Sequence, residues 1–205
     1  MNRFAKTCLA LFATVNLTGI GVALFIHANL GSDTVTVFVD GLSRLLGCSL
    51  GSASRIYNSL MLIIALLVAR KHIGWCSVVY ALSVGFLIDF YSELLLPLNI
   101  MGSILPIKLL WVLAGQLCFG ITYALLIQYR NGMSQVDAIT YYLCEKLKVK
   151  FVKMRTAMDI ILLGAGWLMG GIVGIGSVIA MATTGIFIDA VLKVMNYNCK
   201  TAVTE

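Results

Sequence analysis

Charge is the property that this sequence has least of. Only 12% of its 205 residues are Asp, Glu, Lys or Arg, whereas 60% are hydrophobic and the mean hydropathy is +0.96. A soluble domain has about a quarter of its residues charged, so this chain has too little polar surface to cover a globule that faces water. The shortage of charge excludes a soluble protein and predicts a polytopic membrane protein with the lipid bilayer as its main partner.

Patterns typical of catalysis and metal binding are also missing. The six cysteines show no CxxC or histidine-spaced pattern, so they indicate neither a metal site nor a disulfide framework. No glycine-rich phosphate loop follows a strand, and no serine has a base and an orienting acid at a recognisable spacing. We therefore expect no enzymatic activity and no cofactor. The basic cluster at 146–155 lies beside a predicted span, and we interpret it as a signal facing anionic lipid, not nucleic acid.

Long apolar runs are what the sequence has in place of charge. A helix needs about twenty apolar residues to cross a bilayer, and six runs reach that length. They lie near 5–28, 52–69, 73–95, 108–129, 152–171 and 173–195. The first run has a basic start like that of a signal peptide, but its apolar stretch continues to Ala28, so we expect it to be a retained span. The loops are short, which predicts a single transmembrane domain.

The segments 73–89 and 173–189 are two versions of one sequence. The identical positions are Gly74/Gly174, Ser77/Ser177, Val78/Val178, Gly85/Gly185, Ile88/Ile188 and Asp89/Asp189. At an offset of 101, Gly19 also aligns with Gly120. The chain is therefore interpreted as a repeat at about 5–95, a linker at 96–107 that contains both prolines, and a second repeat at about 108–197.

The basic residues predict how the two repeats are oriented. If the N-terminus is cytoplasmic, twelve of the fifteen basic residues fall in cytoplasmic segments and only Arg44, Arg55 and Lys108 fall outside. This bias places both termini in the cytoplasm. Because three spans is an odd number, the second repeat enters the bilayer from the opposite side. We predict an all-α polytopic membrane protein with six transmembrane helices in two inverted three-helix repeats, an arrangement found in secondary transporters.

Each half also contains a short segment that is too polar to cross lipid alone. The segments 34–47 and 133–149 have a helical apolar stripe with polar residues elsewhere, and Ser134 is the expected cap of the second, with Asp137 three residues on. Two readings stay open for these helices. They either lie flat in the membrane interface or dip into the protein as re-entrant helices.

Four charged residues at membrane depth form two predicted ion pairs. Arg55 and Asp89 lie at one depth in the first half, and Arg155 and Asp189 lie at one depth in the second. A charge in the bilayer is costly unless it is paired or reaches water. The pairs therefore either lock neighbouring spans together or line the two ends of a pathway for a polar solute or ion.

Asn58 and Asp159 align in the repeat and lie one helical turn deeper than the arginines. Because the first half has an amide where the second has an acid, symmetry does not require Asp159. If a proton or cation is coupled to transport, we expect Asp159 to carry it. The predicted candidates for the substrate or ion pathway are Asp89, Asp189, Arg55, Arg155, Asn58, Asp159 and Asp137.

Glycines at helical spacing mark predicted helix contacts. Gly74, Gly85, Gly170, Gly174 and Gly185 are the candidates. The spacing of Gly170 and Gly174 permits two helix backbones to approach closely. The alternative for this pair is a tight turn between the fifth and sixth spans.

Three motifs resemble a known family. These are the first-span pattern GxxxALxIxxxxG, the run from Gly132 to Ile139 that contains Ser134 and Asp137, and the repeated span ending in G-x-x-I-D. Together they are similar to the YczE/YitT group of bacterial integral membrane proteins over roughly residues 15–195. The resemblance implies a bacterial cytoplasmic membrane protein with transport as the usual supposition. In the first half, residues 31–36 depart from the motif, which leaves no role implied for that position.

The sequence leaves three functions open. The first is a transporter of a small polar solute or ion, with the substrate near the interface of the halves. The second is a substrate-capture subunit that relies on an ATPase partner for energy. The third is an accessory membrane protein without transport activity. A homodimer is also compatible with a chain of this size.

Overall fold

The computed structural model describes residues 3–98, 100–102, 104–129, 134–149 and 151–194, and every regular element in this part of the chain is a helix. The long helices are α1 (Arg3–Ala28), α3 (Leu50–Val68), α4 (Trp75–Leu95), α5 (Leu105–Tyr129), α7 (Phe151–Leu168) and α8 (Ile175–Val194). The short helices are α2 (Thr34–Leu46) and α6 (Gln135–Leu147), and the single 3-10 turns are η1 (Arg70–His72), η2 (Leu96–Leu98) and η3 (Ile100–Gly102).

The helices agree with the predicted segments to within a few residues at each boundary. Four stretches are long and apolar enough to cross a membrane, namely Thr7–Ala28, Leu50–Val68, Trp75–Leu98 and Leu105–Leu126. The membrane-type character of the chain is thereby supported. The fifth and sixth spans, which correspond to α7 and α8, and the inverted arrangement of the halves stay predictions.

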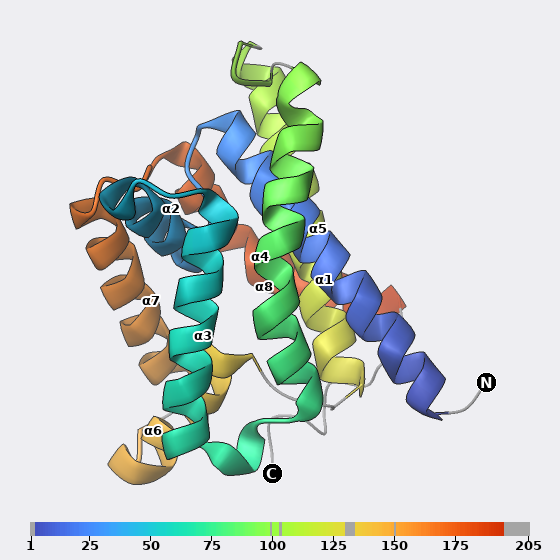
Figure 1. Cartoon of the computed structure of the whole chain (residues 1–205), viewed down its shortest axis with the longest axis vertical. Coiled ribbons are helices and arrows are strands. Elements are labelled where there is room, and N and C mark those ends of the chain that lie inside the picture. Colours follow the sequence, from blue (N-terminus) through green and yellow to red (C-terminus); the bar gives the residue numbers. More distant parts are fainter. Residues whose placement is uncertain (1–2, 99, 103, 130–133, 150, 195–205) are drawn as a thin grey trace.

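The helices pack as two groups, and each group takes two helices from each half of the chain. In the first group α1 packs against α4 and α5, and α5 packs against α8. In the second group α2 and α6 each pack against both α3 and α7. Figure 1 shows the two groups side by side, and the contact between α3 and α4 joins them.

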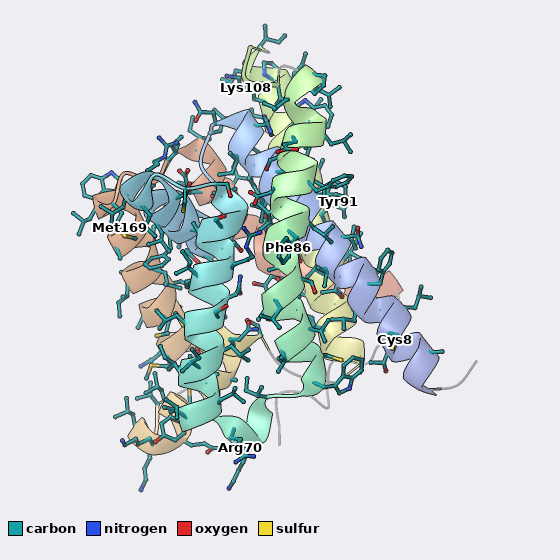
Figure 2. The ribbon with its side chains drawn as sticks, in the orientation of Figure 1. Cys8, Arg70, Phe86, Tyr91, Lys108 and Met169 are labelled. Carbon is teal, nitrogen blue, oxygen red and sulfur yellow. The ribbon has the colours of Figure 1, made fainter. Side chains whose placement is uncertain are left out.

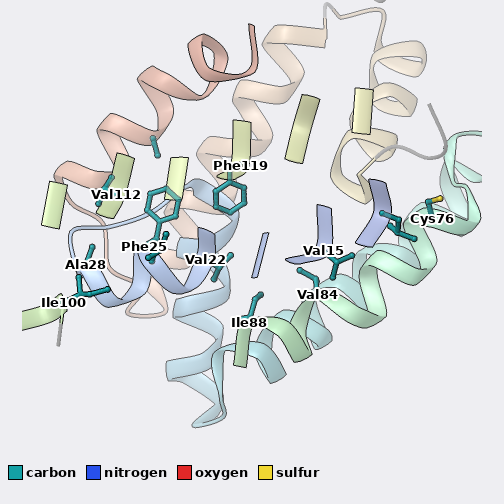
Figure 3. Packing of buried hydrophobic residues seen from close by; sticks show 13 residues of the cluster. Val15, Val22, Phe25, Ala28, Cys76, Val84, Ile88, Ile100, Val112 and Phe119 are labelled. Carbon is teal, nitrogen blue, oxygen red and sulfur yellow. The ribbon is translucent and has the colours of Figure 1, made fainter. Parts of the chain in front are cut away.

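Each group has its own apolar core. The core of the first group combines residues of α1, α4, α5 and α8, and within it the rings of Phe25 and Phe119 lie with centroids 5.7 Å apart (Figure 3). The second core is smaller and contains Val39, Tyr57 and Leu162. Because lipid tails are as apolar as these side chains, van der Waals packing and close backbone approach hold such helices together.

The same glycine contact occurs in both halves. A Cβ added to Gly19 of α1 would lie 3.0 Å from the Cβ of Leu87 of α4. A Cβ added to Gly120 of α5 would lie 2.9 Å from the Cβ of Phe187 of α8. Gly19 aligns with Gly120, and Leu87 aligns with Phe187 at the offset of 100. The aligned residues therefore make equivalent helix contacts.

The outward surface of the helices is strongly apolar. Phe12, Leu67 and Leu168 are 70%, 81% and 80% exposed, respectively. An apolar surface of this extent is unusual for a protein in water and suits contact with lipid. Figure 2 shows Arg70 and Lys108 at opposite ends of the molecule, and we refer to these ends as the Arg70 end and the Lys108 end.

Candidate functional site

A pocket of about 630 Å³, counting the space at its open mouth, lies between the two helix groups. Its walls come from seven helices and from the residue that precedes each short helix. The polar and aromatic residues that line it are Thr18, Asp33, Thr36, Ser54, Tyr57, Asn58, Tyr80, Phe119, Tyr123, Ser134, Gln135 and Arg155. A pocket that is mostly apolar but holds a few convergent polar groups is typical of a small-molecule site.

Both short helices begin at this pocket. Asp33, the N-cap of α2, and Ser134, the N-cap of α6, each line it. Helix N-termini carry a partial positive charge from their unpaired N–H groups. Ser134 occupies the predicted cap position, but its side chain makes no capping hydrogen bond. The side chain of Asp137 lies outside the described residues.

Asp33 is the acid that faces the pocket directly. Its Oδ2 accepts a long hydrogen bond of 3.5 Å from the N–H of Thr36, which caps α2. Its Oδ1 is buried and has no hydrogen-bond partner. Burial raises the pKa of the Asp33 carboxyl above its usual value. Hydrogen bonding with the side chain of Thr36 and with the N–H groups of Thr36 and Val35 acts against this rise, and the charge of Asp159 adds to it.

Arg155 and Asp159 form a pair at the side of the pocket. The Nε of Arg155 donates to Oδ2 of Asp159 at 3.2 Å, and Oγ1 of Thr34 donates to Oδ1 of Asp159 at 3.0 Å. The second bond joins the first residue of α2 to α7. Asp159 lies nine residues before the end of α7 at Leu168, which is about 14 Å along the helix axis at 1.5 Å per residue. The start of α2 therefore lies well below the end of α7.

The predicted residue Asn58 also lines the pocket and is buried. Its amide nitrogen donates to the carbonyl oxygen and the hydroxyl of Ser54, at 2.9 and 3.1 Å. The neighbouring Tyr57 is 3% exposed, and its hydroxyl has no hydrogen-bond partner. An unpaired buried hydroxyl is costly, so the pocket offers a donor that a ligand or water is expected to use.

A second hollow of about 430 Å³ adjoins the pocket and shares Tyr80, Phe119, Tyr123, Ser134 and Gln135 with it. It continues along the first turn of α4, at Cys76 and Ser77, and along the last turns of α5, at Leu126. Both of these segments lie toward the Arg70 end. The two hollows together lead from the middle of the molecule toward that end.

Arg55 and Asp89 lie away from the pocket and pair with each other. The Nη1 of Arg55 lies 3.5 Å from Oδ2 of Asp89, as the sequence predicts. The Asp89 carboxylate also accepts hydrogen bonds from the Gly51 N–H at 2.7 Å and the Ser49 hydroxyl at 3.0 Å, at the start of α3. The Arg55 guanidinium lies 4.4 Å from the ring centroid of Phe86. These contacts fasten α3 to α4 and favour the locking role for this pair.

The second predicted pair differs from the first. Arg155 pairs with Asp159 on its own helix, and the side chain of Asp189 lies outside the described residues. Spacing explains the observed pair, because residues four apart in a helix face each other. Of the predicted pathway residues, Arg155 and Asn58 line the pocket, and Asp159 lies behind Arg155 as its partner. Arg55 and Asp89 lie instead at the α3–α4 contact.

The predicted packing glycines fall into two kinds. A Cβ at Gly85 would overlap Arg55 and the Gly51 backbone, so Gly85 allows α3 and α4 to touch. Gly174 contacts the backbone of Leu30 in the α1–α2 connection. Gly170 instead ends α7 at a φ of +92°, where an added Cβ would meet no close neighbour, so it forms a turn.

The two remaining predicted packing glycines are Gly74 and Gly185. Gly74 precedes α4 as its N-cap without a side-chain bond. The surroundings of Gly185 in α8 lie outside the described residues.

The connection between α7 and α8 is held by Asp40 of α2. Its Oδ2 accepts a hydrogen bond from the Ile172 N–H at 2.9 Å, and its Oδ1 accepts one from Nε of Arg44 at 3.1 Å. Asp40 is 5% exposed. Next to it, an added Cβ at Gly41 would overlap the Gly166 carbonyl oxygen. The contact is therefore close and polar, on the side of the molecule away from the Arg70 end.

Asp33 and the tyrosines are pocket residues that the sequence pattern did not single out. A signal for Asp33 is present, because at the offset of 101 it aligns with Ser134, the expected cap of the second short helix. Tyr57, Tyr80 and Tyr123 have no such signal, since an aromatic residue in a span usually packs against lipid or other helices.

These features define a class of protein, in which the described residues form helices of membrane type around a mostly apolar pocket with a few polar groups. The chain belongs to DUF6198, a family of unknown function whose sequence profile matches residues 5–193. It is 23% identical over 191 residues to an uncharacterised protein of Haemophilus influenzae, covering 93% of this chain and 85% of the relative. It is 21% identical over 179 residues to the uncharacterised protein YyaS of Bacillus subtilis, covering 87% and 89%. No solved structure matches the chain.

Proposed function

We propose that this protein moves a small polar solute or ion across the bacterial cytoplasmic membrane by alternating access. The observation that carries the proposal is the polar pocket between two helix groups, each of which contains helices from both halves of the chain. A central site between two helix groups can be exposed to one side or the other when one group rocks against the other. In this proposal the pocket is the substrate site, and the two helix groups are the parts that move relative to each other.

The proposal includes six spans in two inverted repeats of the YczE/YitT type. The equivalent contacts of Gly19 with Leu87 and of Gly120 with Phe187 support the duplication. If α7 spans the bilayer, the start of α2 lies about 14 Å inside its end, which supports the re-entrant reading of the short helices. Irregular backbone at that depth is tolerated where it faces protein or a water-filled cavity.

The described contacts fit a state that is open toward the Arg70 end. Away from that end, the backbones of Gly51 and Gly85 touch, and so do those of Gly41 and Gly166. Toward the Arg70 end, the hollow continues between α4 and α5. With both termini in the cytoplasm, as the basic residues predict, this conformation opens to the cytoplasm.

Uptake by purified protein in liposomes that contain no ATPase tests the proposal. Radiolabelled lysine, choline, mannitol and succinate cover cationic, neutral and anionic solutes. We expect saturable uptake of at least one of them above protein-free liposomes. Asp159→Asn removes the charge that pairs with Arg155 and should lower uptake at least tenfold. The exposed Glu93 lies outside the pocket, so Glu93→Gln is the matched control and should stay within twofold of wild type.

The other outcomes identify the competing functions. Binding of a solute without uptake would indicate a capture subunit that depends on an ATPase. Absence of both binding and uptake for all four solutes would favour an accessory protein. Uptake that is unchanged in Asp159→Asn would remove the Arg155–Asp159 pair from the transport pathway.

A further inference from the structure

One charge in the pocket has no partner. Arg155 is matched by Asp159 at 3.2 Å, so this pair contributes little net charge. Asp33 uses Oδ2 to cap α2, and its buried Oδ1 has no hydrogen-bond partner. A buried carboxylate oxygen without a donor is costly unless a ligand, a proton or water satisfies it. The pocket therefore presents one unmatched acceptor, and a bound cation would compensate the charge of the ionised Asp33 carboxylate.

Aromatic rings line the same pocket as this acceptor. Tyr57 of α3, Tyr80 of α4, and Phe119 and Tyr123 of α5 all line the pocket. Two of these rings are held in place by neighbours. Tyr57 packs against Phe38 with centroids 5.3 Å apart, and the Tyr80 hydroxyl donates to Oγ1 of Thr18 at 3.4 Å. Ring faces attract cations, most strongly where water is excluded.

We propose that the pocket recognises a small organic amine in its protonated form, with the ammonium group at Asp33 Oδ1 and the hydrocarbon part against the aromatic rings. This proposal deepens the transport function and rests on it, because it names the class of solute that the pathway carries. The hydroxyl of Tyr57, which is a free donor, and the amide of Asn58 are placed to bind a polar group at the other end of the amine.

An anionic solute fits the same pocket less well. The N-termini of α2 and α6 favour negative charge, but Asp33 already occupies the first of them. The guanidinium of Arg155 is bound to Asp159. An anion would therefore have to approach Asp33 without an unmatched cation to compensate, which is unfavourable in a partly buried site.

Three probes of one shape separate charge from size. 3,3-Dimethylbutylammonium, 3,3-dimethyl-1-butanol and 3,3-dimethylbutanoate share a hydrocarbon body and differ in the charge of the terminal group. Their affinities for the detergent-solubilised full chain are measured at neutral pH by isothermal titration calorimetry. We expect the amine to bind at least tenfold more tightly than the alcohol and the carboxylate.

The variant Asp33→Asn tests whether Asp33 is the recognising group. Asn caps helices as well as Asp does, so α2 is expected to stay folded, and circular dichroism checks this. In Asp33→Asn the affinity for the amine should fall to within twofold of that for the alcohol. Glu93→Gln, on the exposed part of α4, should keep the wild-type preference.

Several results would overturn the proposal. They are equal binding of all three probes, tighter binding of the carboxylate, no binding of the amine at millimolar concentration, or an amine preference that survives Asp33→Asn. The liposome assay separates this failure from failure of the transport function. Uptake of mannitol or succinate without any amine preference would reject the amine site and keep the transporter. Preferential binding of the amine without uptake of any solute would keep the amine site and reject the transport function.

Discussion

At the residue scale, the acids of this protein differ in what their oxygens already bind. Asp40 and Asp159 each accept bonds on both oxygens, and Asp89 accepts bonds from Gly51 and Ser49 besides its contact with Arg55. Such carboxylates hold helices together. Asp33 alone among these four has an oxygen without a partner. This difference separates an acid that is available for binding from acids that are occupied by the fold.

The first prediction concerns the stability cost of Asp33. Burial raises the pKa of its carboxyl, so the folded protein takes up a proton more readily than the unfolded chain, and stability falls as pH rises through the folded-state pKa. Asp33→Asn removes this charge and keeps the cap. A gain of about 1 kcal/mol would raise Tm at pH 7 by about 2–4 °C in a chain of this size.

The pH dependence of this gain provides the check. Thermal melts in detergent should show the difference in Tm between Asp33→Asn and wild type shrinking as pH falls toward 4. Among the residues whose side chains are described, the other titratable groups around Asp33 are Arg155 and Asp159 on α7 and tyrosines on α3, α4 and α5 (Tyr57, Tyr80 and Tyr123). A Tm difference that is independent of pH would show that the Asp33 charge is not the cause.

The sequence predicts part of the site at this scale. The Arg55–Asp89 pair follows from depth alone, because both residues lie at one level of adjacent spans. The depth of the two residues does not show what the pair does. Its role in joining α3 to α4 follows from the hydrogen bond that Asp89 accepts at the start of α3. The partner of Arg155 depends on rotamer choice between Asp159, four residues away on the same helix, and more distant groups. The pattern of apolar runs does not predict a role for Asp33, because this residue lies in the connection between α1 and α2.

At the element scale, glycines determine how closely the two groups approach. A Cβ at Gly51 would overlap the carbonyl oxygen of Gly85 and the carboxylate of Asp89. Neither of these can move without separating α3 from α4. Small residues at helix contacts in membranes act through this close approach.

The second prediction compares two glycine substitutions. Gly51→Ala should lower Tm by about 2–12 °C, because overpacking costs about 1–3 kcal/mol. Gly164→Ala is the matched control, since an added Cβ there meets nothing within 4 Å and alanine is the better helix former by about 1 kcal/mol. Its Tm should be equal to or slightly above that of wild type. If both variants melted alike, the α3–α4 contact would not be as tight as described.

The short helix α2 shows why pattern alone is insufficient for an element. The sequence predicts the position and length of this helix well, because the predicted segment is 34–47 and the observed helix is Thr34–Leu46. It does not give its orientation. The polar residues Thr36 and Asp40 are buried, whereas the apolar Leu46 is 52% exposed. A polar face points inward here because it meets a pocket and the backbone of another helix.

At the scale of the whole molecule, the two halves are related but not equal. Three glycines make close contacts on the side of the molecule away from the Arg70 end. In the other half of the chain, the residues aligned with them at the offset of 100 are larger. The pairs are Gly51 with Phe151, Gly166 with Leu66, and Gly176 with Cys76. Larger residues keep helices further apart. This difference in residue size is consistent with a hollow that opens toward the Arg70 end.

The third prediction tests the orientation of the molecule in the membrane. In a background without cysteine, we introduce Lys71→Cys near the Arg70 end and Gly102→Cys in η3, both at exposed positions. A membrane-impermeant maleimide added to intact cells should label Gly102→Cys and should label Lys71→Cys only after lysis. The inverted topology is untenable if both positions react from the same side.

Sequence predicts the number and order of helices in this chain better than their grouping. Apolar runs give the helices because each run must satisfy its own backbone. The repeat predicts a substrate site between the two halves of the chain. The structure instead groups α1 and α4 with α5 and α8, and α2 and α3 with α6 and α7. That grouping depends on contacts between residues a hundred positions apart, which no local pattern contains.

The packing of α2 against α7 has a consequence for how the chain matures during synthesis. Asp40 finds its backbone partner at Ile172, a residue that leaves the ribosome after most of the chain has been made. Until then the nascent first half holds an acid without that partner, and α2 lacks its contact with the α7–α8 connection. We expect the insertion of α2 to be a late event, so that a truncated first half expressed alone would be a substrate for membrane proteases, whereas two separately expressed halves could rescue each other.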